Sequence, residues 1–371
     1  MTRSTRLLST LFGTLALSAC SGEIAAVSAP YDAGPEASSS SSSGSGEAVP
    51  PSSSSSSSGG SSGSSSGGPV VTGSCAIPAG APHDPAAKPV VLAHVSSASG
   101  IAVDGTNAYV ASYEIGPVYR VALDGSGVTT LHSLSATNVA INSTTVYTVS
   151  PSGGSAPQGL VVGCAKAGCN GQYTTLATGQ NDVWGVAADD VNVYWTNQAP
   201  GGSVMKAPIG GGPATTLSAA GAANSIVAVG GRVIYTGTNG ASGTEGMLSI
   251  PATGGSPTVL VPPGGNAGVF ALAADCTNAY YQLNDGTIGQ VPVGGGTPKV
   301  LTKGSQGYGL QMAVDAESVY FIDGQGIKAV PIGGGAVTTL ATGVNPGALA
   351  VDATRVYWTN LGDSTLMAVA K

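Results

Sequence analysis

The sequence predicts an all-β protein in which residues 88–371 form a seven-bladed β-propeller. Three observations lead to this prediction. A motif best represented by VYWTN recurs about every 41 residues, each repeat reads as four short strands, and the last repeat lacks a strand that an N-terminal segment can supply. Four antiparallel strands repeated at roughly 40–45 residues are typical of propeller blades.

The number of blades follows from a tyrosine that every repeat contains. Aligned on this residue, successive repeats are separated by 38, 47, 41, 45, 40 and 37 residues. The aligned residues are Tyr109, Tyr147, Tyr194, Tyr235, Tyr280, Tyr320 and Tyr357. Seven tyrosines at these spacings predict seven blades.

Within a repeat, the four strands come in a fixed order. A short apolar strand ends in Asp, as in LAVD at 349–352, and a tight turn leads to a second strand such as VYWTN. A third strand, as in GIKAVPI at 326–332, is followed by a glycine turn and a fourth strand, as in VTTLAT at 337–342. Alternating apolar residues and β-branched residues favour strands, and the Gly, Pro, Asn and Asp between them favour turns. No segment has a helical period.

The two ends of the repeat region complement each other. The seventh repeat supplies strands at 349–352, 356–360 and 365–370 and then ends. The segment KPVVLAHVS, residues 88–96, precedes the first repeat and matches a fourth strand. We expect this N-terminal strand to complete the last blade, because closing the ring leaves no free sheet edge.

The repeat sequence also resembles a known family. VDATRVYWTN and DDVNVYWTN resemble the YWTD repeat of low-density-lipoprotein-receptor-type propellers, with Asn in place of the final Asp, over residues 88–371. Similar repeats occur in bacterial exported lipoproteins of unassigned activity. The resemblance implies a propeller and, because the receptor propellers bind proteins, a protein partner. The repeat Asp is Asp104, Asp189, Asp275, Asp315 and Asp352; Asn142 and Gly230 replace it in blades two and four, which we expect to be less regular.

Residues 1–19 read as an export signal. Arg3 and Arg6 precede an apolar run from Leu7 to Leu17, which is shorter than the roughly 20 residues that a membrane-spanning helix needs. The sequence Leu17-Ser-Ala-Cys20 resembles the lipobox of bacterial lipoproteins, which implies cleavage before Cys20 and acylation of its thiol. The alternative is an ordinary secretory signal with an incidental cysteine. We expect an exported protein that is lipid-anchored in the bacterial cell envelope, at the outer membrane or cell surface.

Residues 20–87 are rich in Ser and Gly and have no apolar face to bury, so we expect a disordered tether. Removal of the signal leaves ten Lys and Arg against nineteen Asp and Glu, a formal charge near −9. This balance disfavours nucleic acid and anionic lipid headgroups as partners.

Four cysteines remain once Cys20 is assigned to lipid. Cys164 and Cys169 stand five residues apart across an expected turn, which suggests a disulfide, and Cys75 and Cys276 pair by elimination. The alternatives are free buried thiols or a metal pair, although a metal needs more ligands than the sequence places nearby.

The sequence gives little support for catalysis. His83 lies in the linker, His94 in the closing strand and His132 in an outer fourth strand, so we expect no histidine at the central channel and no catalytic triad. We therefore predict no catalytic residue, no cofactor and no metal site. The repeat Asp residues are expected to accept backbone N–H groups in the turns that follow them.

The variable loops and the channel mouth are the best candidates for a ligand-binding face. Five residues before the repeat Asp stand Trp184, Phe270 and Leu310, with Tyr308 nearby, whereas the other blades have Ser99, Thr137, Ser225 and Gly347 there. Acidic residues of the same loops include Glu114, Asp285, Asp323 and Asp363. Together they suggest a hydrophobic shelf for a cationic or amphipathic ligand, such as a peptide. In the alternative interpretation the aromatic residues plug the channel and the acidic residues are solvated turn formers.

The sequence therefore favours a membrane-tethered propeller that acts as a binding or interaction module through its variable loop face. An exported propeller enzyme of the lyase or hydrolase type and a structural surface component without a discrete ligand are the alternatives.

Overall fold

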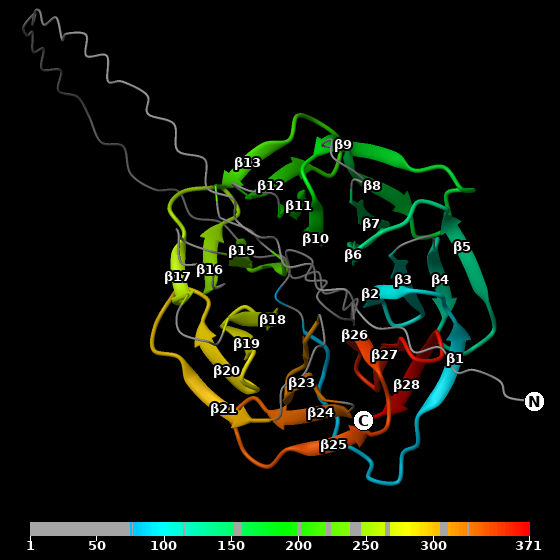
Figure 1. Ribbon diagram of the computed structural model, residues 1–371, viewed down its shortest axis with the longest axis vertical. Coiled ribbons are helices and arrows are strands. Elements are labelled where there is room, and N and C mark those ends of the chain that lie inside the picture. The colour runs from blue at the N-terminus through cyan, green and yellow to red at the C-terminus, as the bar shows by residue number, and fades with distance from the viewer. Residues whose placement is uncertain are drawn as a thin grey trace, which may run out of the picture. The chain divides into compact units, whose positions relative to one another are not determined.

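A computed structural model describes residues 75, 77–113, 116–151, 158–198, 202–219, 224–237, 246–263, 268–304, 311–324 and 326–371. The predicted signal peptide, Cys20 and most of the Ser/Gly-rich segment lie outside these residues. All regular elements of the described residues are strands, which form seven four-stranded antiparallel sheets arranged as the blades of a ring (Figure 1). No helix in this part of the chain is long and apolar enough to cross a membrane. The seven-bladed propeller predicted from the sequence is confirmed.

Blades 1 to 6 each use four strands that are consecutive in the chain, ordered from the centre outward. Blade 1 contains β2 (Ala98–Val103), β3 (Asn107–Ser112), β4 (Val118–Ala122) and β5 (Val128–His132), and blade 2 contains β6 (Asn138–Ile141), β7 (Thr145–Ser150), β8 (Gly159–Ala165) and β9 (Thr174–Gln180). Blade 3 contains β10 (Val183–Ala188), β11 (Asn192–Asn197), β12 (Ser203–Pro208) and β13 (Thr215–Ser218), and blade 4 contains β14 (Ile226–Val229), β15 (Arg232–Gly237), β16 (Gly246–Pro251) and β17 (Thr258–Val261). Blade 5 contains β18 (Val269–Ala274), β19 (Asn278–Leu283), β20 (Thr287–Pro292) and β21 (Lys299–Lys303), and blade 6 contains β22 (Ala313–Val314), β23 (Ser318–Asp323), β24 (Gly326–Pro331) and β25 (Thr338–Ala341).

Blade 7 joins the two ends of the propeller. It contains β26 (Pro346–Val351), β27 (Arg355–Asn360) and β28 (Thr365–Ala370), and its outer strand is β1 (Val90–His94). Strand β1 pairs antiparallel with β28, with Val90 opposite Ala368 and His94 opposite Thr365. Figure 1 shows the cyan β1 beside the red β28. The predicted closure of the last blade by the N-terminal strand is therefore confirmed.

The hydrophobic core lies between neighbouring blades. Trp195 of blade 3 packs with Tyr147 and Val149 of blade 2, and Trp358 of blade 7 packs with Tyr320 and Ile322 of blade 6. Both tryptophans are fully buried. Since each sheet buries one face against the blade before it and the other against the blade after it, the repeat cannot form a core alone.

The ends of the strands define two faces of the propeller. The lower face carries the turns between first and second strands and those between third and fourth strands. The upper face carries the loops that enter the first strand of each blade and those that join second to third strands. These two names are used for the rest of the description.

On the lower face, the repeat Asp stabilises the first turn of its blade. In blade 3 one carboxylate oxygen of Asp189 accepts the backbone N–H groups of Val191 and Asn192, at 2.8 and 2.6 Å, and the other accepts the Tyr194 hydroxyl at 2.8 Å. The same three bonds recur at Asp104, Asp275, Asp315 and Asp352. Burial and the adjacent carboxylate raise the pKa of Tyr194 above its usual range. The repeat Asp and Tyr residues thus form a structural pair.

The two blades that lack the Asp differ from each other. In blade 2, Asn142 accepts the N–H groups of Thr144 and Thr145, and its amide nitrogen donates to the Tyr147 hydroxyl at 3.2 Å, so this blade keeps the regular turn. In blade 4, Gly230 and Gly231 have φ of 53° and 72° between the paired residues Val229 and Arg232. Positive φ at both central residues is typical of a two-residue type I′ hairpin. The expectation that both blades are less regular is therefore wrong for blade 2, and in blade 4 only the turn differs, because β14 and β15 pair without a register shift.

Both predicted disulfides are present. Cys164–Cys169 closes the hairpin between β8 and β9, and Cys75–Cys276 joins the N-terminal segment to the first turn of blade 5 across a sequence separation of 201 residues. A Cβ atom on Gly230 would lie 3.0 Å from the Cys276 sulfur. The short glycine turn of blade 4 therefore leaves room for this disulfide.

Beyond Cys75, part of the stretch expected as linker lies along the lower face. The Pro78 carbonyl accepts the Ala316 N–H at 3.0 Å, and His83 lines a small pocket with Glu317, Tyr320 and Lys371. We call residues 77–89 the strap. It runs from the disulfide at blade 5, past blade 6, to β1 in blade 7.

The scarce basic residues link neighbouring blades. Lys166 forms an ion pair with Asp104 of blade 1 (3.1 Å), and Lys371 forms a buried one with Asp315 of blade 6 (2.5 Å). Other basic side chains donate to backbone carbonyl oxygens of the next blade: Arg120 to Lys166, Lys206 to Ala252, Lys299 to Gly333 and Arg355 to Leu123. Most of the positive charge of the domain is thus used to join blades.

Candidate functional site

The candidate site is a pocket at the upper end of the central channel. The first strand of each blade begins at the upper face, and the residue five positions before the repeat Asp stands at this end of the strand. In blades 1 to 5 these residues are Ser99, Thr137, Trp184, Ser225 and Phe270, and all five line one pocket of about 180 Å³. Asn138 and Asn224 complete its lining. Equivalent positions of five blades thus converge on one site.

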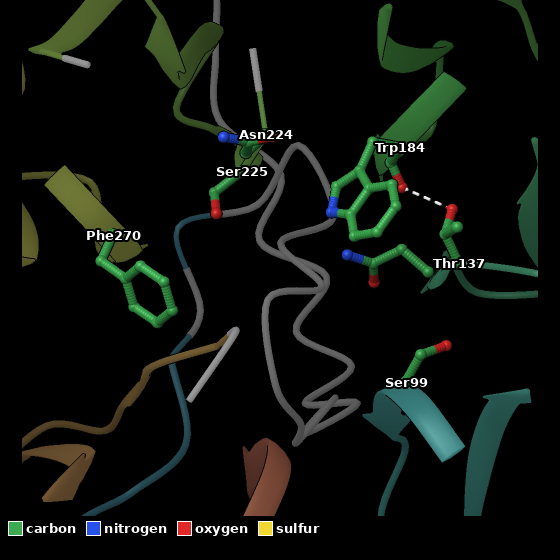
Figure 2. A pocket seen from close by; sticks show the side chains of 7 residues that line it. Ser99, Thr137, Trp184, Asn224, Ser225 and Phe270 are labelled. Carbon is green, nitrogen blue, oxygen red and sulfur yellow. Dashed lines mark hydrogen bonds between the residues drawn. The ribbon is translucent and has the colours of Figure 1, made fainter. Parts of the chain in front are cut away.

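Two aromatic rings dominate the pocket. Trp184 is the second residue of β10 and Phe270 the second residue of β18, and Figure 2 shows the two side chains on opposite sides of the opening. Both are half-buried. The ring of Tyr113, which is 41% exposed, lies 5.9 Å from that of Trp184 at an angle of 59°. The upper face therefore carries exposed aromatic surface on both sides of the opening.

Hydrogen bonds between blades hold the polar part of the lining in place. The Ser99 hydroxyl donates to the Ala136 carbonyl oxygen at 3.0 Å, and the Thr137 hydroxyl donates to the Trp184 carbonyl oxygen at 2.8 Å (Figure 2). Each bond joins one blade to the next. The second bond also fixes the backbone from which the indole projects.

Next to the pocket, a glutamine side chain links blade 6 to blades 1 and 2. Gln311 of blade 6 is 5% exposed, and its amide nitrogen donates to the side-chain oxygen of Asn138 in blade 2 at 3.1 Å. Its amide oxygen accepts the N–H of Ile101 in blade 1 at 3.4 Å. These bonds cross the ring. Since Asn138 also lines the pocket, Gln311 lies directly beside the residues that form it.

Glycines allow the inner strands to approach one another around the site. A Cβ atom on Gly185, the residue after Trp184, would lie 2.4 Å from the carbonyl oxygen of Asn224. A Cβ on Gly100 would lie 3.0 Å from the side-chain oxygen of Asn138. The pocket can therefore hold its two asparagines only because these neighbouring positions have no side chain.

The described residues that line the pocket carry no ionisable side chain. Among the residues that the structure describes, no group of three or more His, Cys, Asp or Glu is placed to hold a metal ion. What the pocket offers is aromatic surface, hydroxyl groups and amide groups. Such a lining binds by shape and hydrogen bonding.

The predicted acidic residues Asp285, Asp323 and Asp363 are not among the residues that line the pocket. Asp285 accepts the Thr287 N–H and forms an exposed ion pair with Lys303 at 3.1 Å, and Asp363 accepts the Thr365 hydroxyl at 2.6 Å. The Thr287 and Lys303 hydrogen bonds hold the pKa of Asp285 below its usual value. Asp323 stands at the end of β23, close to Gly304. Of the other candidates, Glu114, Tyr308 and Leu310 lie outside the described residues.

Sequence reasoning did not single out three residues of the site. Asn138 follows Thr137 and Asn224 precedes Ser225, so each stands next to an aligned position and could have been found by extending the alignment by one residue. Tyr113 follows the second strand of blade 1, and no repeat signal marks it.

Comparisons with known proteins bear on the fold. No protein-family model matches the chain, and no curated protein matches it in sequence. A chain from the crystal structure of a nidogen/laminin complex aligns with 17% identity over 57% of this chain and 86% of that chain, with a TM-score of 0.45. YCF48 from Cyanidioschyzon merolae aligns with 14% identity over 76% of this chain and 98% of that chain, with a TM-score of 0.56. The second likeness supports the fold alone.

The fold and the site together define a class. Residues 88–371 form a seven-bladed β-propeller with an aromatic pocket at the upper end of the ring, and the described lining of this pocket carries no charge.

Proposed function

We propose that the protein is a binding module that engages its ligand through the upper face of the propeller. One observation carries this proposal: equivalent positions of five blades converge on a pocket whose two aromatic side chains are half-buried. Large aromatic side chains left accessible around a hollow are typical of binding surfaces. Elsewhere in the described blades the tryptophans are fully buried: Trp195 and Trp358 are both 0% exposed.

The proposal extends to the placement of the protein. The lipobox-like ending at Cys20 supports export and lipid anchorage, and the Ser/Gly-rich segment supports display of the propeller away from a membrane. In the producing cell, Cys20→Ser should move the protein from the membrane fraction to the soluble fraction. If the variant stays with the membrane to the same extent, the anchor assignment is wrong.

The binding proposal is tested by capture of ligands with the full chain, with Trp184→Ala and Phe270→Ala as variants. Both should lose at least about tenfold in affinity, since removal of a large buried anchor in an interface costs about 2 kcal/mol or more. Tyr173→Ala is the matched control, because Tyr173 is an aromatic residue at the outer edge of blade 2 with 39% exposure. Ligands that bind all four proteins equally would show that the upper face is not the binding site.

A further inference from the structure

The lining of the mouth pocket narrows the chemistry of its ligand. Three polar groups have no hydrogen-bond partner among the described residues: the indole N–H of Trp184, the amide nitrogen of Asn138 and the hydroxyl of Ser225. The hydroxyls of Ser99 and Thr137 donate to carbonyl groups and keep lone pairs free to accept. The pocket therefore presents both donors and acceptors.

The charge of the ligand follows from the same lining. A cation would find no carboxylate among the described lining residues, and the carboxylates of Asp285 and Asp363 accept hydrogen bonds within their own turns. An anion would find no basic side chain there and would approach a chain of net negative charge. An entirely apolar group would leave the free donors and hydroxyls without partners, which costs free energy. A neutral ligand with many hydroxyl groups is favoured.

The volume of the pocket and its two aromatic rings indicate which kind of group can enter it. The pocket volume of about 180 Å³ is smaller than the roughly 300–1,000 Å³ of sites for drug-sized ligands, so it holds one ring-sized group. Trp184 and Phe270 lie on opposite sides of the opening (Figure 2), and the negative faces of their rings attract polarised C–H groups. A pyranose ring has C–H groups on its faces and hydroxyl groups around its edge.

We propose that the ligand is a neutral carbohydrate, one sugar ring of which enters the mouth pocket. This inference rests on the proposed binding function and specifies its ligand. The sugar ring packs against Trp184 and Phe270. Its hydroxyl groups accept a hydrogen bond from the side-chain amide of Asn138 and form hydrogen bonds with the hydroxyl groups of Ser99 and Ser225. The indole N–H of Trp184 donates to a further sugar oxygen.

The experiment titrates the detergent-solubilised full chain with free glucose, galactose, mannose and N-acetylglucosamine, and with short neutral oligosaccharides of each. Tryptophan fluorescence reports binding, because Trp184 is accessible whereas Trp195 and Trp358 are fully buried. Calorimetry measures the affinities of the variants. At least one sugar should bind saturably, with a dissociation constant on the order of 1 mM for a single ring, equivalent to about −4 kcal/mol.

The variants separate sugar recognition from structural damage. Trp184→Ala and Phe270→Ala should each weaken binding at least about tenfold, and Ser225→Ala, which breaks no internal hydrogen bond of the hydroxyl, should weaken it severalfold. Tyr173→Ala should bind as the wild type does. Should Trp184→Ala fold poorly, Trp184→Phe keeps the ring and removes the N–H, and an intermediate loss is expected.

Two outcomes overturn the inference in different ways. If no neutral sugar binds but a protein or peptide is captured and lost in Trp184→Ala, the carbohydrate assignment is wrong and the binding function stands. If neither sugars nor any other ligand depends on Trp184 and Phe270, both are wrong. Equal or tighter binding of glucuronic acid, the charged counterpart of glucose, would also contradict the assignment, because the lining offers no charge to it.

Discussion

The lower and upper faces of this propeller use the same strands in opposite ways. At the lower end of the first strand, six blades carry Asp or Asn that closes its own turn and holds the repeat tyrosine. At the upper end of the same strand, five positions earlier, the residues differ from blade to blade and converge on a pocket. The residue type at the lower end of the first strand recurs among the blades, whereas the residue type at the upper end varies.

The difference shows how a repeat fold separates stability from binding. The lower face also carries both disulfides, the strap and the basic residues that join blades. Because the lower face stabilises the ring, the upper positions are released from a common structural role and can carry different side chains. Changes on the lower face should therefore alter stability, and changes on the upper face should alter binding.

The largest expected effect comes from the long-range disulfide. Replacing both cysteines, Cys75→Ser with Cys276→Ser, should lower the free energy of unfolding by about 5 kcal/mol, since the bond closes a loop of about 200 residues. Replacing Cys164 and Cys169, which are five residues apart, by serine should lower the free energy of unfolding by about 2 kcal/mol. Urea unfolding measures both. Equal losses would show that loop length does not govern the stabilisation.

The next effect concerns the turn of blade 3. Asp189→Ala should cost about 2–3 kcal/mol, because the Tyr194 hydroxyl and two backbone N–H groups lose their acceptor. Asp189→Asn should cost less than about 1 kcal/mol, because Asn142 serves the same turn in blade 2. Thermal unfolding of both variants checks this. If Asp189→Asn lowers the free energy of unfolding as much as Asp189→Ala does, the charge of the carboxylate is required.

A pH effect of up to about 3 kcal/mol is expected at the junction of blades 1 and 2. His132 is 1% exposed, lies 3.3 Å from the Thr148 hydroxyl oxygen and packs edge-on against Tyr173. Burial lowers the pKa of His132 from 6.5 to about 4. Between these values the unfolded chain binds the extra proton and the native state does not, so stability falls as the pH falls from 6.5 to 4.

Comparison with His132→Leu isolates this contribution. The difference in unfolding free energy between the wild type and the variant should change with pH between 6.5 and 4 and should be constant above this window. Binding at the mouth pocket should vary little over the same range, because its described lining has no ionisable group. A difference independent of pH would show that the pKa of His132 is the same in the native and the unfolded state.

The smallest expected effect on stability is at the pocket itself. Trp184→Ala should lower the free energy of unfolding by about 1 kcal/mol or less, since the indole is only partly buried, whereas Trp195→Ala removes a fully buried indole and should cost about 3–5 kcal/mol. Thermal unfolding compares the two. Equal losses would indicate that Trp184 is a core residue, as the plugged-channel interpretation requires.

The fold could be predicted from the sequence because its signals are local. Strand alternation, the Asp before each turn and the tyrosine spacing each span a few residues and recur seven times. The closing strand was found because the last repeat lacked what residues 88–96 supply. The two disulfides followed from spacing and elimination. The missing Asp of blade 4 correctly pointed to a different turn there, but the turn of blade 2 keeps the common form, since an amide oxygen can accept the same N–H groups.

The site could be predicted only in part. The alignment placed Trp184 and Phe270 at equivalent positions, and the structure places both in one pocket. It grouped Asp285 and Asp363 with them, although the structure holds both in turns of their own. Alignment within a repeat gives the height of a residue along its strand, but it does not give the direction in which a loop side chain points.

The sequence by itself determined the number of blades, the order of strands and the closure of the ring, because hydrophobic periodicity and turn chemistry act over short stretches of chain. Only the tertiary structure decided that Gln311 of blade 6 bonds to Asn138 of blade 2, that the strap lies along the lower face, and that five blades share one pocket whose described lining is uncharged. The physical reason is that these contacts join residues far apart in the chain, whose separation is set by the curvature of the closed ring.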